Sequence, residues 1–198
     1  MDKIELKKTE ILGTALNIFA NKGYHSAKIS DIAAAMNMGH GTFYRYFKDK
    51  LDVFSSVIDK IVSEILTVLI KEDPSLSNNL NEYREQLKRI GEGMFKVFLK
   101  DEKIAKLIFY VALGIDDQIN SKINRSFALF DEYTEKYLIN GEKKGFLKQN
   151  LNTLNLSKAI NAMIFGAIKD TLNSKTPEET FSNWLESISL LMLEGMAS

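Results

Sequence analysis

The chain has 198 residues, 45% of them hydrophobic, which is enough to bury one medium domain or a small domain and a larger one. Its 26 Lys and Arg balance 26 Asp and Glu, so the chain as a whole is not a basic polymer-binding protein. The absence of cysteine excludes a disulfide framework and a thiol nucleophile, and only 2 prolines favour an all-helical fold.

The first residues, MDKIELKK, lack the apolar segment of a secretory signal peptide. No apolar run in the chain approaches the roughly 20 residues that a membrane-spanning helix needs. We therefore expect a cytoplasmic protein with no membrane partner.

Residues 29–54 carry two short helical patterns with a tight break between them. The apolar residues of the first pattern follow the i, i+3, i+4, i+7 spacing of one helix face: Ile29, Ile32, Ala33 and Met36. In the second, over residues 40–47, Phe43 and Phe47 lie four residues apart, and the opposite side offers a glycine and an arginine with little aliphatic bulk. Such a helix can enter a DNA groove, so the segment predicts a helix-turn-helix.

Several motifs follow one another in order between Thr9 and Ile58. They are TEILGTALNIFANKGY, Asp31-Ile32-Ala33, Gly41-Thr42-Phe43-Tyr44 and Tyr46-Phe47-Lys48-Asp49-Lys50. This co-linear set resembles the DNA-binding domain of the TetR family of bacterial transcriptional regulators. The resemblance implies an all-α protein of about nine helices. An N-terminal three-helix DNA-binding domain would span residues 4–50, with its motif at 28–47, and a larger helical ligand-binding and dimerisation domain would span 51–198.

Three positions depart from the family's usual pattern. Lys28 stands where a Thr or Ser commonly caps the first motif helix, although a lysine can still approach a phosphate as a point charge. The turn reads Asn37-Met38-Gly39, which makes Gly39 the N-cap of the second motif helix. His40 replaces a frequent lysine, and we expect it to change how the first base step is read.

The DNA contacts expected from the motif and the resemblance divide into two groups. Base-edge contacts are assigned to His40, Gly41, Thr42 and Arg45, and phosphate contacts to Lys28, Tyr44, Tyr46, Lys48 and Lys50. The alternatives are that the tyrosines pack on the surface, that the lysines are ordinary solvated charges and that Arg45 meets phosphate or solvent. Residues 22–50 contain five Lys or Arg and two Asp, so this segment carries +3 despite the neutral chain.

Helical patterns continue to the end of the chain, with no strand pattern between them. They predict helices from Lys50 through Leu69, over 80–99 and 102–113, from Asp116 or Asp117 to Lys144, over 156–172, and from Pro177 onward. Asp49 is expected to cap the first of these helices. The last is expected to open with a capping box at Thr176-Pro177-Glu178-Glu179.

The last two helices carry more apolar surface than one neighbour within a monomer needs. Supported by the resemblance, this predicts a homodimer interface at Ile160, Met163, Ala167, Trp184, Ile188 and Leu191. The alternative is that both helices complete the core of the monomer. A dimer would place two recognition helices about 34–36 Å apart, one turn of DNA, so the operator should be palindromic.

The middle of the chain is rich in aromatic residues. A ligand pocket is assigned to Phe95, Phe98, Phe109, Leu113, Phe127, Phe130 and Phe165, against the alternative of plain hydrophobic core. Such a lining favours a hydrophobic or amphipathic small molecule. The segments ALGIDDQINSKINRSF and GEKKGFLKQNLN are loosely similar to the ligand regions of family members that respond to fatty acyl compounds.

The resemblance implies a repressor that leaves its operator when ligand in the body shifts the connector at residues 49–69. Two histidines, no cysteine and no nucleophile or phosphate-binding motif argue against an enzyme, a cofactor or a metal site. The alternative function is a ligand-blind or partner-dependent helix-turn-helix protein that binds DNA with low sequence specificity.

Overall fold

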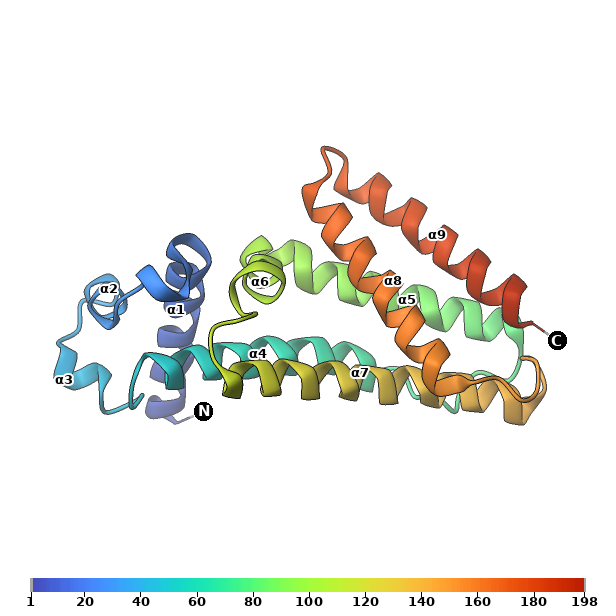
Figure 1. Cartoon of the computed structure of the whole chain (residues 1–198), viewed down its shortest axis with the longest axis horizontal. Coiled ribbons are helices and arrows are strands. Elements are labelled where there is room, and N and C mark those ends of the chain that lie inside the picture. Colours follow the sequence, from blue (N-terminus) through green and yellow to red (C-terminus); the bar gives the residue numbers. More distant parts are fainter. Residues whose placement is uncertain (1, 198) are drawn as a thin grey trace. The chain divides into compact units, whose positions relative to one another are not determined.

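The computed structural model describes residues 2–197, in which helices are joined by short connections (Figure 1). The elements are α1 (Lys3–Ser26), α2 (Ile29–Ala35), α3 (His40–Phe43), α4 (Lys50–Ile70), α5 (Leu80–Lys100), α6 (Glu102–Lys106), the π-helix η1 (Leu107–Val111), α7 (Asp117–Lys144), α8 (Thr153–Asn173) and α9 (Pro177–Met196). No helix among these residues is both long and apolar enough to cross a membrane. The predicted all-α fold with about nine helices is confirmed.

The chain divides into two compact units. The motif unit comprises residues 1–63 and 101–123, and the body unit comprises residues 64–100 and 124–198. Both α4 and α7 contribute residues to each unit. These units follow packing rather than function, so the division into a DNA-binding domain and a ligand-binding domain after residue 50 stays a prediction.

The motif unit is built around the apolar face of α1. Phe19 is fully buried, and its ring meets that of Phe54 edge-on, with centroids 4.9 Å apart. The other core side chains of α1 to α3 include Ile11, Ala15, Ala20, Ile32, Ala33 and Phe43, of which the last three lie on the predicted apolar faces. Helix α6 and η1 pack on the same α1. The apolar spacing of the sequence therefore explains the core that holds the motif.

Helices α5, α8 and α9 pack against one another in the body unit (Figure 1). Glycine permits two of the close approaches of α5. A Cβ at Gly91 would lie 2.8 Å from Cδ1 of Leu185 on α9, and a Cβ at Gly93 would lie 2.5 Å from Cγ1 of Val68 on α4. A residue larger than glycine at position 91 or 93 would collide with Leu185 or Val68. These two side chains therefore pack directly against the backbone of α5.

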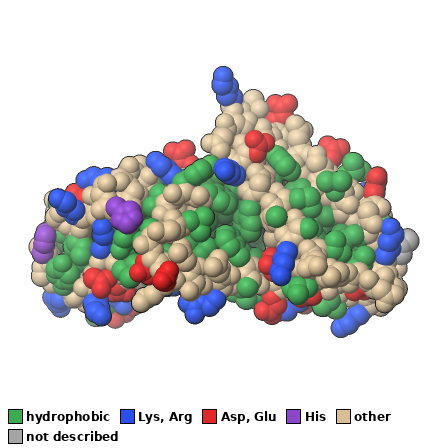
Figure 2. All heavy atoms as spheres, in the orientation of Figure 1, with side chains coloured by type: hydrophobic (Ala, Val, Ile, Leu, Met, Phe, Trp, Pro, Cys, Tyr) green, Lys and Arg blue, Asp and Glu red, His purple; other side chains and the backbone are tan. Residues whose placement is uncertain are grey.

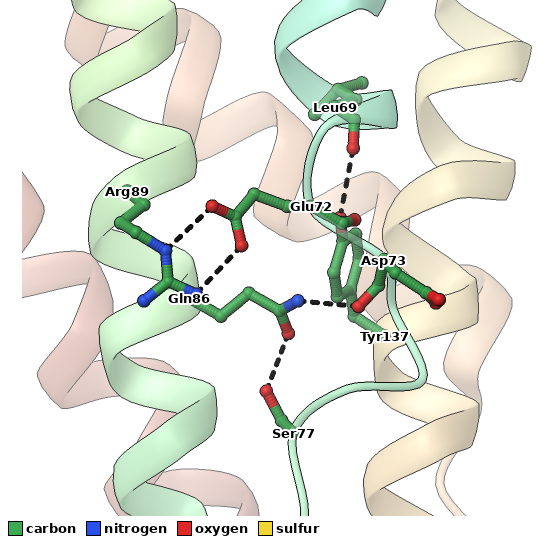
Figure 3. A network of polar contacts seen from close by, with 7 residues as sticks. All are labelled: Leu69, Glu72, Asp73, Ser77, Gln86, Arg89 and Tyr137. Atoms are coloured by element: carbon green, nitrogen blue, oxygen red, sulfur yellow. Dashed lines mark hydrogen bonds and ion pairs between the residues drawn. The ribbon is translucent and has the colours of Figure 1, made fainter.

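The segment between α4 and α5 is held by polar contacts from α5 (Figure 3). Arg89 makes two hydrogen bonds to the Glu72 carboxylate, at 2.7 and 2.8 Å, and these bonds lower the pKa of Glu72. Gln86 donates to the Asp73 carbonyl at 2.7 Å and accepts from the Ser77 hydroxyl at 2.7 Å. A non-helical stretch thereby gains fixed partners for its backbone and side chains.

Helix α7 holds the same segment from its other side. The Tyr137 hydroxyl donates to the carbonyls of Leu69 and Glu72 (Figure 3). Further along α7, the Lys144 ammonium bonds the carbonyls of Ser75 and Ser77 at 2.6 and 3.0 Å. The connection between α4 and α5 is therefore pinned to two helices.

The helix expected over residues 102–113 differs from its prediction. It begins as α6 and continues as η1, where the Ala112 N–H donates to the Leu107 carbonyl at 2.8 Å across five residues. The wider turn keeps Leu107, Ile108 and Ala112 buried. Apolar periodicity does not distinguish such a turn from regular α-helix.

The start of α9 also needs a correction. Pro177 occupies the first turn as expected, but the Thr176 side chain makes no cap hydrogen bond, so the predicted capping box is wrong. Ser174 takes over: its hydroxyl accepts from the Thr176 N–H at 3.0 Å and lies 2.7 Å from the Thr180 hydroxyl. Ser174, two residues before Thr176, thus supplies the polar partner at the start of α9.

Replacing Tyr137 with Phe should destabilise the chain by about 1–2 kcal/mol, because buried carbonyls at the end of α4 lose their donor. The measurement is urea unfolding followed by circular dichroism. Tyr133→Phe on the same helix is the control and should change the free energy of unfolding much less. Equal effects of the two substitutions would contradict a specific role for the Tyr137 hydroxyl.

Candidate nucleic-acid interface and apolar cavity

Helix α2 is capped by an acidic side chain of its own first turn. The Asp31 carboxylate accepts from the Lys28 backbone N–H at 2.9 Å and pairs with the Lys22 ammonium at 2.9 Å. The hydrogen bonds from Lys22 and from the Lys28 backbone lower the pKa of Asp31. Capping therefore does not need the Lys28 side chain, which is exposed.

Helix α3 is shorter than the predicted helix over 40–47. Gly39 is its N-cap, as expected, and makes no side-chain bond. Beyond Phe43 the chain continues in looser turns, in which the Phe47 N–H still donates to the Phe43 carbonyl at 3.2 Å. Both phenylalanines are buried and anchor this segment on the motif unit.

The outward side of this segment is polar and open. The exposed predicted contacts are Lys28, His40, Gly41, Thr42, Tyr44, Arg45 and Lys48, and Tyr46 is half-buried. A Cβ at Gly41 would meet no atom within 4 Å, so internal packing does not require glycine there. Figure 2 shows purple His side chains on this unit, among blue Lys and Arg and red Asp and Glu side chains. The surface can meet an anionic, grooved partner.

Lys50 does not share this outward orientation. Its ammonium donates to the carbonyls of Tyr24, His25 and Ala27, at 2.9, 3.3 and 3.1 Å, and lies 4.4 Å from the centroid of the Tyr24 ring. Its donors thus serve the end of α1, where Gly23 has a φ of +74° and interrupts the helix. The phosphate contact of Lys50 therefore stays a prediction, and within the chain its ammonium positions the end of α1.

The junction into α4 is capped on both sides. Asp49 accepts from the Asp52 N–H at 2.8 Å, as its predicted cap role requires, and Asp52 accepts from the Lys48 N–H at 2.7 Å. Only the backbone of Lys48 is used, and its side chain stays exposed. This pair of bonds fixes where the outward segment ends and α4 begins.

The body unit contains an apolar cavity of about 80 Å³ between α5, α8 and α9. Its lining includes Phe95, whose ring stacks on that of Phe181 with centroids 4.0 Å apart. Ser189 is the one side chain with a hydroxyl among the lining residues. A cavity of this lining stays dry and accepts hydrocarbon rather than polar groups.

The other predicted pocket residues do not line this cavity. Phe165 contacts Phe127 and Phe130 in an aromatic cluster with centroid separations of 5.1 and 6.1 Å, and Phe98 is buried core. Phe109 and Leu113 belong to the motif unit, and Leu113 is exposed. Of the predicted set, Phe95 lines this cavity, and a pocket at the other positions stays a prediction. Aromatic content alone does not say which helix face each ring occupies.

The predicted dimer residues are mostly used within the monomer. Ile160, Ala167 and Ile188 are 3%, 6% and 8% exposed, and Trp184 joins them in lining the cavity. For these residues the alternative, monomer core, describes the structure. Leu191 is 64% exposed and Met163 half-buried. The open side of α8 instead carries the small residues Ala159, Ala162 and Gly166.

Metal binding has no candidate among the described residues, since no three His, Asp or Glu side chains between residues 2 and 197 are grouped to hold an ion. The surface of the motif unit and the apolar cavity of the body unit are the two sites on which a function can be argued.

Comparison with known proteins identifies the motif. Residues 11–57 match the sequence model described as bacterial regulatory proteins, tetR family. The chain belongs to the TetR family. It is a helix-turn-helix DNA-binding transcriptional regulator.

Relatives extend the likeness over the rest of this TetR-family chain. The fatty acid metabolism regulator protein of Bacillus subtilis is 24% identical over 171 residues, which cover 85% of this chain and 82% of that protein. The structure of the fatty acid degradation regulator FadR from Bacillus halodurans superposes with a TM-score of 0.76 at 24% identity, covering 96% of this chain and 95% of the other. The structure of FadR from Bacillus subtilis in complex with stearoyl-CoA superposes with a TM-score of 0.73 at 23% identity, covering 94% of this chain and 98% of the other. These structures establish the fold of the whole chain.

Two features of this TetR-family chain left no signal in the sequence. The Lys50 ammonium reaches carbonyls 23 to 26 residues earlier, and no local pattern announces that contact. The close fit of Gly91 against Leu185 depends on how α5 crosses α9. The sequence indicates this contact only by placing a glycine, Gly91, inside a strongly helical stretch.

The substitutions Lys50→Met and Lys48→Met distinguish a lysine that positions the end of α1 from a lysine that contacts a DNA phosphate. Lys50→Met should lower thermal stability and DNA affinity while leaving the salt dependence of binding unchanged. Lys48→Met should leave stability unchanged and reduce the slope of log affinity against log salt by about 0.9, the value for one phosphate that is no longer neutralised. The measurements are thermal melts and DNA binding titrated at several salt concentrations. A reduced slope for Lys50→Met would contradict its positioning role.

Proposed function

We propose that this TetR-family transcriptional regulator is a homodimeric repressor of a palindromic operator, released by a hydrophobic or amphipathic small molecule. The observation that carries the DNA-binding part is the polar, exposed side of residues 40–48 over the buried Phe43 and Phe47. An apolar cavity in the body unit supports the ligand part. The proposal includes no catalytic step and a cytoplasmic location, where the operator would be.

In the proposed complex, α3 and the turns after it lie in the major groove. Gly41 allows close approach of the backbone, and Thr42, Arg45 and His40 face base edges. Phosphate contacts come from exposed side chains around them: Lys28, Tyr44, Tyr46 and Lys48. Two such surfaces in a symmetric dimer would read half-sites about 34–36 Å apart.

The proposed dimer uses the open faces of α8 and α9. The small side chains Ala159, Ala162 and Gly166 leave α8 approachable by a helix of a second copy. Leu191 on α9 is a large apolar side chain that stays mostly exposed in the monomer, so its burial would favour association. Met163 stays in the proposed interface, and the buried Ile160, Ala167 and Ile188 leave it.

The proposed effector occupies the cavity between α5, α8 and α9. A hydrocarbon group that fills a cavity of about 80 Å³ contributes at most roughly 2 kcal/mol at 24 cal/mol per Å³. The relative crystallised with stearoyl-CoA has a ligand that carries such a group. Helices α4 and α7, which run through both units, are the candidates for carrying a shift to the motif, with a coupling of about 1–3 kcal/mol.

The alternative function is a ligand-blind or partner-dependent protein of low sequence specificity. The ratio of specific to non-specific affinity at fixed salt separates the two, because specific regulators bind their site about 10³-fold or more tighter. The cavity favours the ligand-responsive regulator.

Selection of random duplex DNA by the purified protein at moderate salt should enrich an inverted repeat. Arg45→Ala should then lose about 1–3 kcal/mol on the selected site and relax the preference at one base position in each half-site, because Arg45 is assigned to a base edge. Equal losses on selected and scrambled DNA would assign Arg45 to phosphate. A retained pool without any motif would favour the alternative function.

Leu191→Glu should shift the protein from dimer to monomer, since a charge cannot be buried in an apolar helix interface without a partner. Sedimentation velocity at micromolar protein measures the distribution. Leu76→Glu is the matched control, because Leu76 is 62% exposed and lies in the α4–α5 connection, away from the proposed interface. A dimer that survives Leu191→Glu would contradict this interface.

A further inference from the structure

Two hollows of the body unit adjoin each other at α9. The apolar cavity lies between α5, α8 and α9, and an open groove of about 560 Å³ lies between α5 and α9. Leu185 and Ser189 line both. The side chains of these two residues therefore separate the cavity from the groove.

Leu185 lies against the backbone of α5 at Gly91. A Cβ at Gly91 would lie 2.8 Å from Cδ1 of Leu185, so the leucine rests directly against the glycine. Gly91 also lines the cavity. The far end of a leucine side chain can change rotamer, and such a change would join the cavity to the groove.

The groove has walls of opposite charge. Helix α5 contributes Arg84, Lys88 and Glu85, which sum to +1, and α9 contributes Glu186 and Glu194, which sum to −2. A ligand group with one cation and one anion can face both walls at once. A polyanion would face the two carboxylates of α9, and the five charges together sum to −1.

We infer that the ligand of this site is a single-chain amphiphile with a zwitterionic head group. Its hydrocarbon tail passes Leu185 into the apolar cavity, and its head lies in the groove with the anionic part toward α5 and the cationic part toward α9. The inference rests on the proposed function only in treating this ligand as the effector. It goes further by assigning the head group, the entry side and the gate.

The tail assignment follows from the lining of the cavity. Met94, Ile164, Phe181 and Trp184 are among its walls, and a charged group there would lose its hydration without gaining a partner. Because the cavity holds only about 80 Å³, a tail of several methylenes must displace Leu185. Binding of the tail in the cavity therefore requires movement of the Leu185 side chain.

Trp184 provides a local probe of this site. It is the only tryptophan of the chain, it lines the cavity, and its indole N–H donates to Asp170 at 2.8 Å. Entry of a tail should shift its emission without interference from any other tryptophan.

The experiment titrates the full-length protein with amphiphiles that share a decyl tail and differ in head group, each below its micelle concentration. The probes are decylphosphocholine, decyl maltoside, decyl sulfate, decyltrimethylammonium and decanoyl-CoA. We expect decylphosphocholine to bind at least tenfold more tightly than the others by Trp184 fluorescence. Equal affinities, or tightest binding of decanoyl-CoA, would overturn the zwitterion assignment.

Charge variants test the two walls. Arg84→Gln with Lys88→Gln should move the preference to decyltrimethylammonium, and Glu186→Gln with Glu194→Gln should move it to decyl sulfate. The matched control is Lys96→Gln with Lys100→Gln, the same change of charge on exposed positions of α5 outside the groove. Head-group preferences that do not change in either groove variant would overturn the inference.

Filling variants test the tail site. Ala167→Leu should abolish binding of decylphosphocholine, whereas Ala128→Leu on the exposed side of α7 should not. Should Ala167→Leu fail to fold by circular dichroism, Gly91→Ala serves instead. Its methyl group must displace Leu185, and the affinity should fall severalfold. Unchanged affinity in the folded variant would overturn the tail site.

Measuring the release of operator DNA beside Trp184 fluorescence distinguishes a failure of this inference from a failure of the proposed function. A change at Trp184 without release of DNA would leave the site intact and contradict its role as effector site. Release of DNA by a compound that leaves Trp184 unchanged would support the ligand-responsive regulator and overturn the site assigned here.

Discussion

A four-residue helix is far too short to be stable by itself, so α3 exists only because Phe43 and Phe47 are buried in the motif unit. That anchoring determines which side of the segment faces outward and leaves the hydroxyls, the imidazole and Arg45 in solvent. Other polar contacts in the motif unit also fix how this segment is held. Asp31 caps α2, Asp49 and Asp52 cap the start of α4, and Lys50 joins α4 to the end of α1. The outward polar surface proposed to bind DNA is thus a consequence of core packing.

The sequence was sufficient for the elements and for the inward side of most of them. Spacing alone locates the buried Phe43 and Phe47, because a helix with one apolar face turns that face toward the core. It failed for α8, which is apolar on more than one side. Ile160 and Ala167 were predicted at the dimer surface and lie inside the monomer, and only the way in which α8 meets α5 and α9 decides between the faces. The contacts of Lys50 leave no signal in the sequence for a related reason, since the end of α1 becomes its neighbour only in the folded chain.

The body unit combines a connection held by polar contacts with an apolar cavity. The α4–α5 connection is pinned by Arg89, Gln86 and Tyr137, so the end of α4 has defined partners. The cavity beside Gly91 is underpacked by comparison, and its wall at Leu185 depends on one rotatable side chain. Ligand-responsive proteins need such a difference, because a ligand shifts an equilibrium only when it binds two arrangements with different affinity.

The most direct test of the coupling between the two sites is the affinity of the tightest-binding amphiphile, measured at Trp184 with and without saturating operator DNA. Linkage requires that if the amphiphile weakens operator binding, the operator weakens amphiphile binding by the same factor. We predict that operator DNA raises the dissociation constant about 5- to 150-fold. An unchanged dissociation constant would show that the cavity and the DNA-binding surface are independent, and would contradict a regulator released through this cavity.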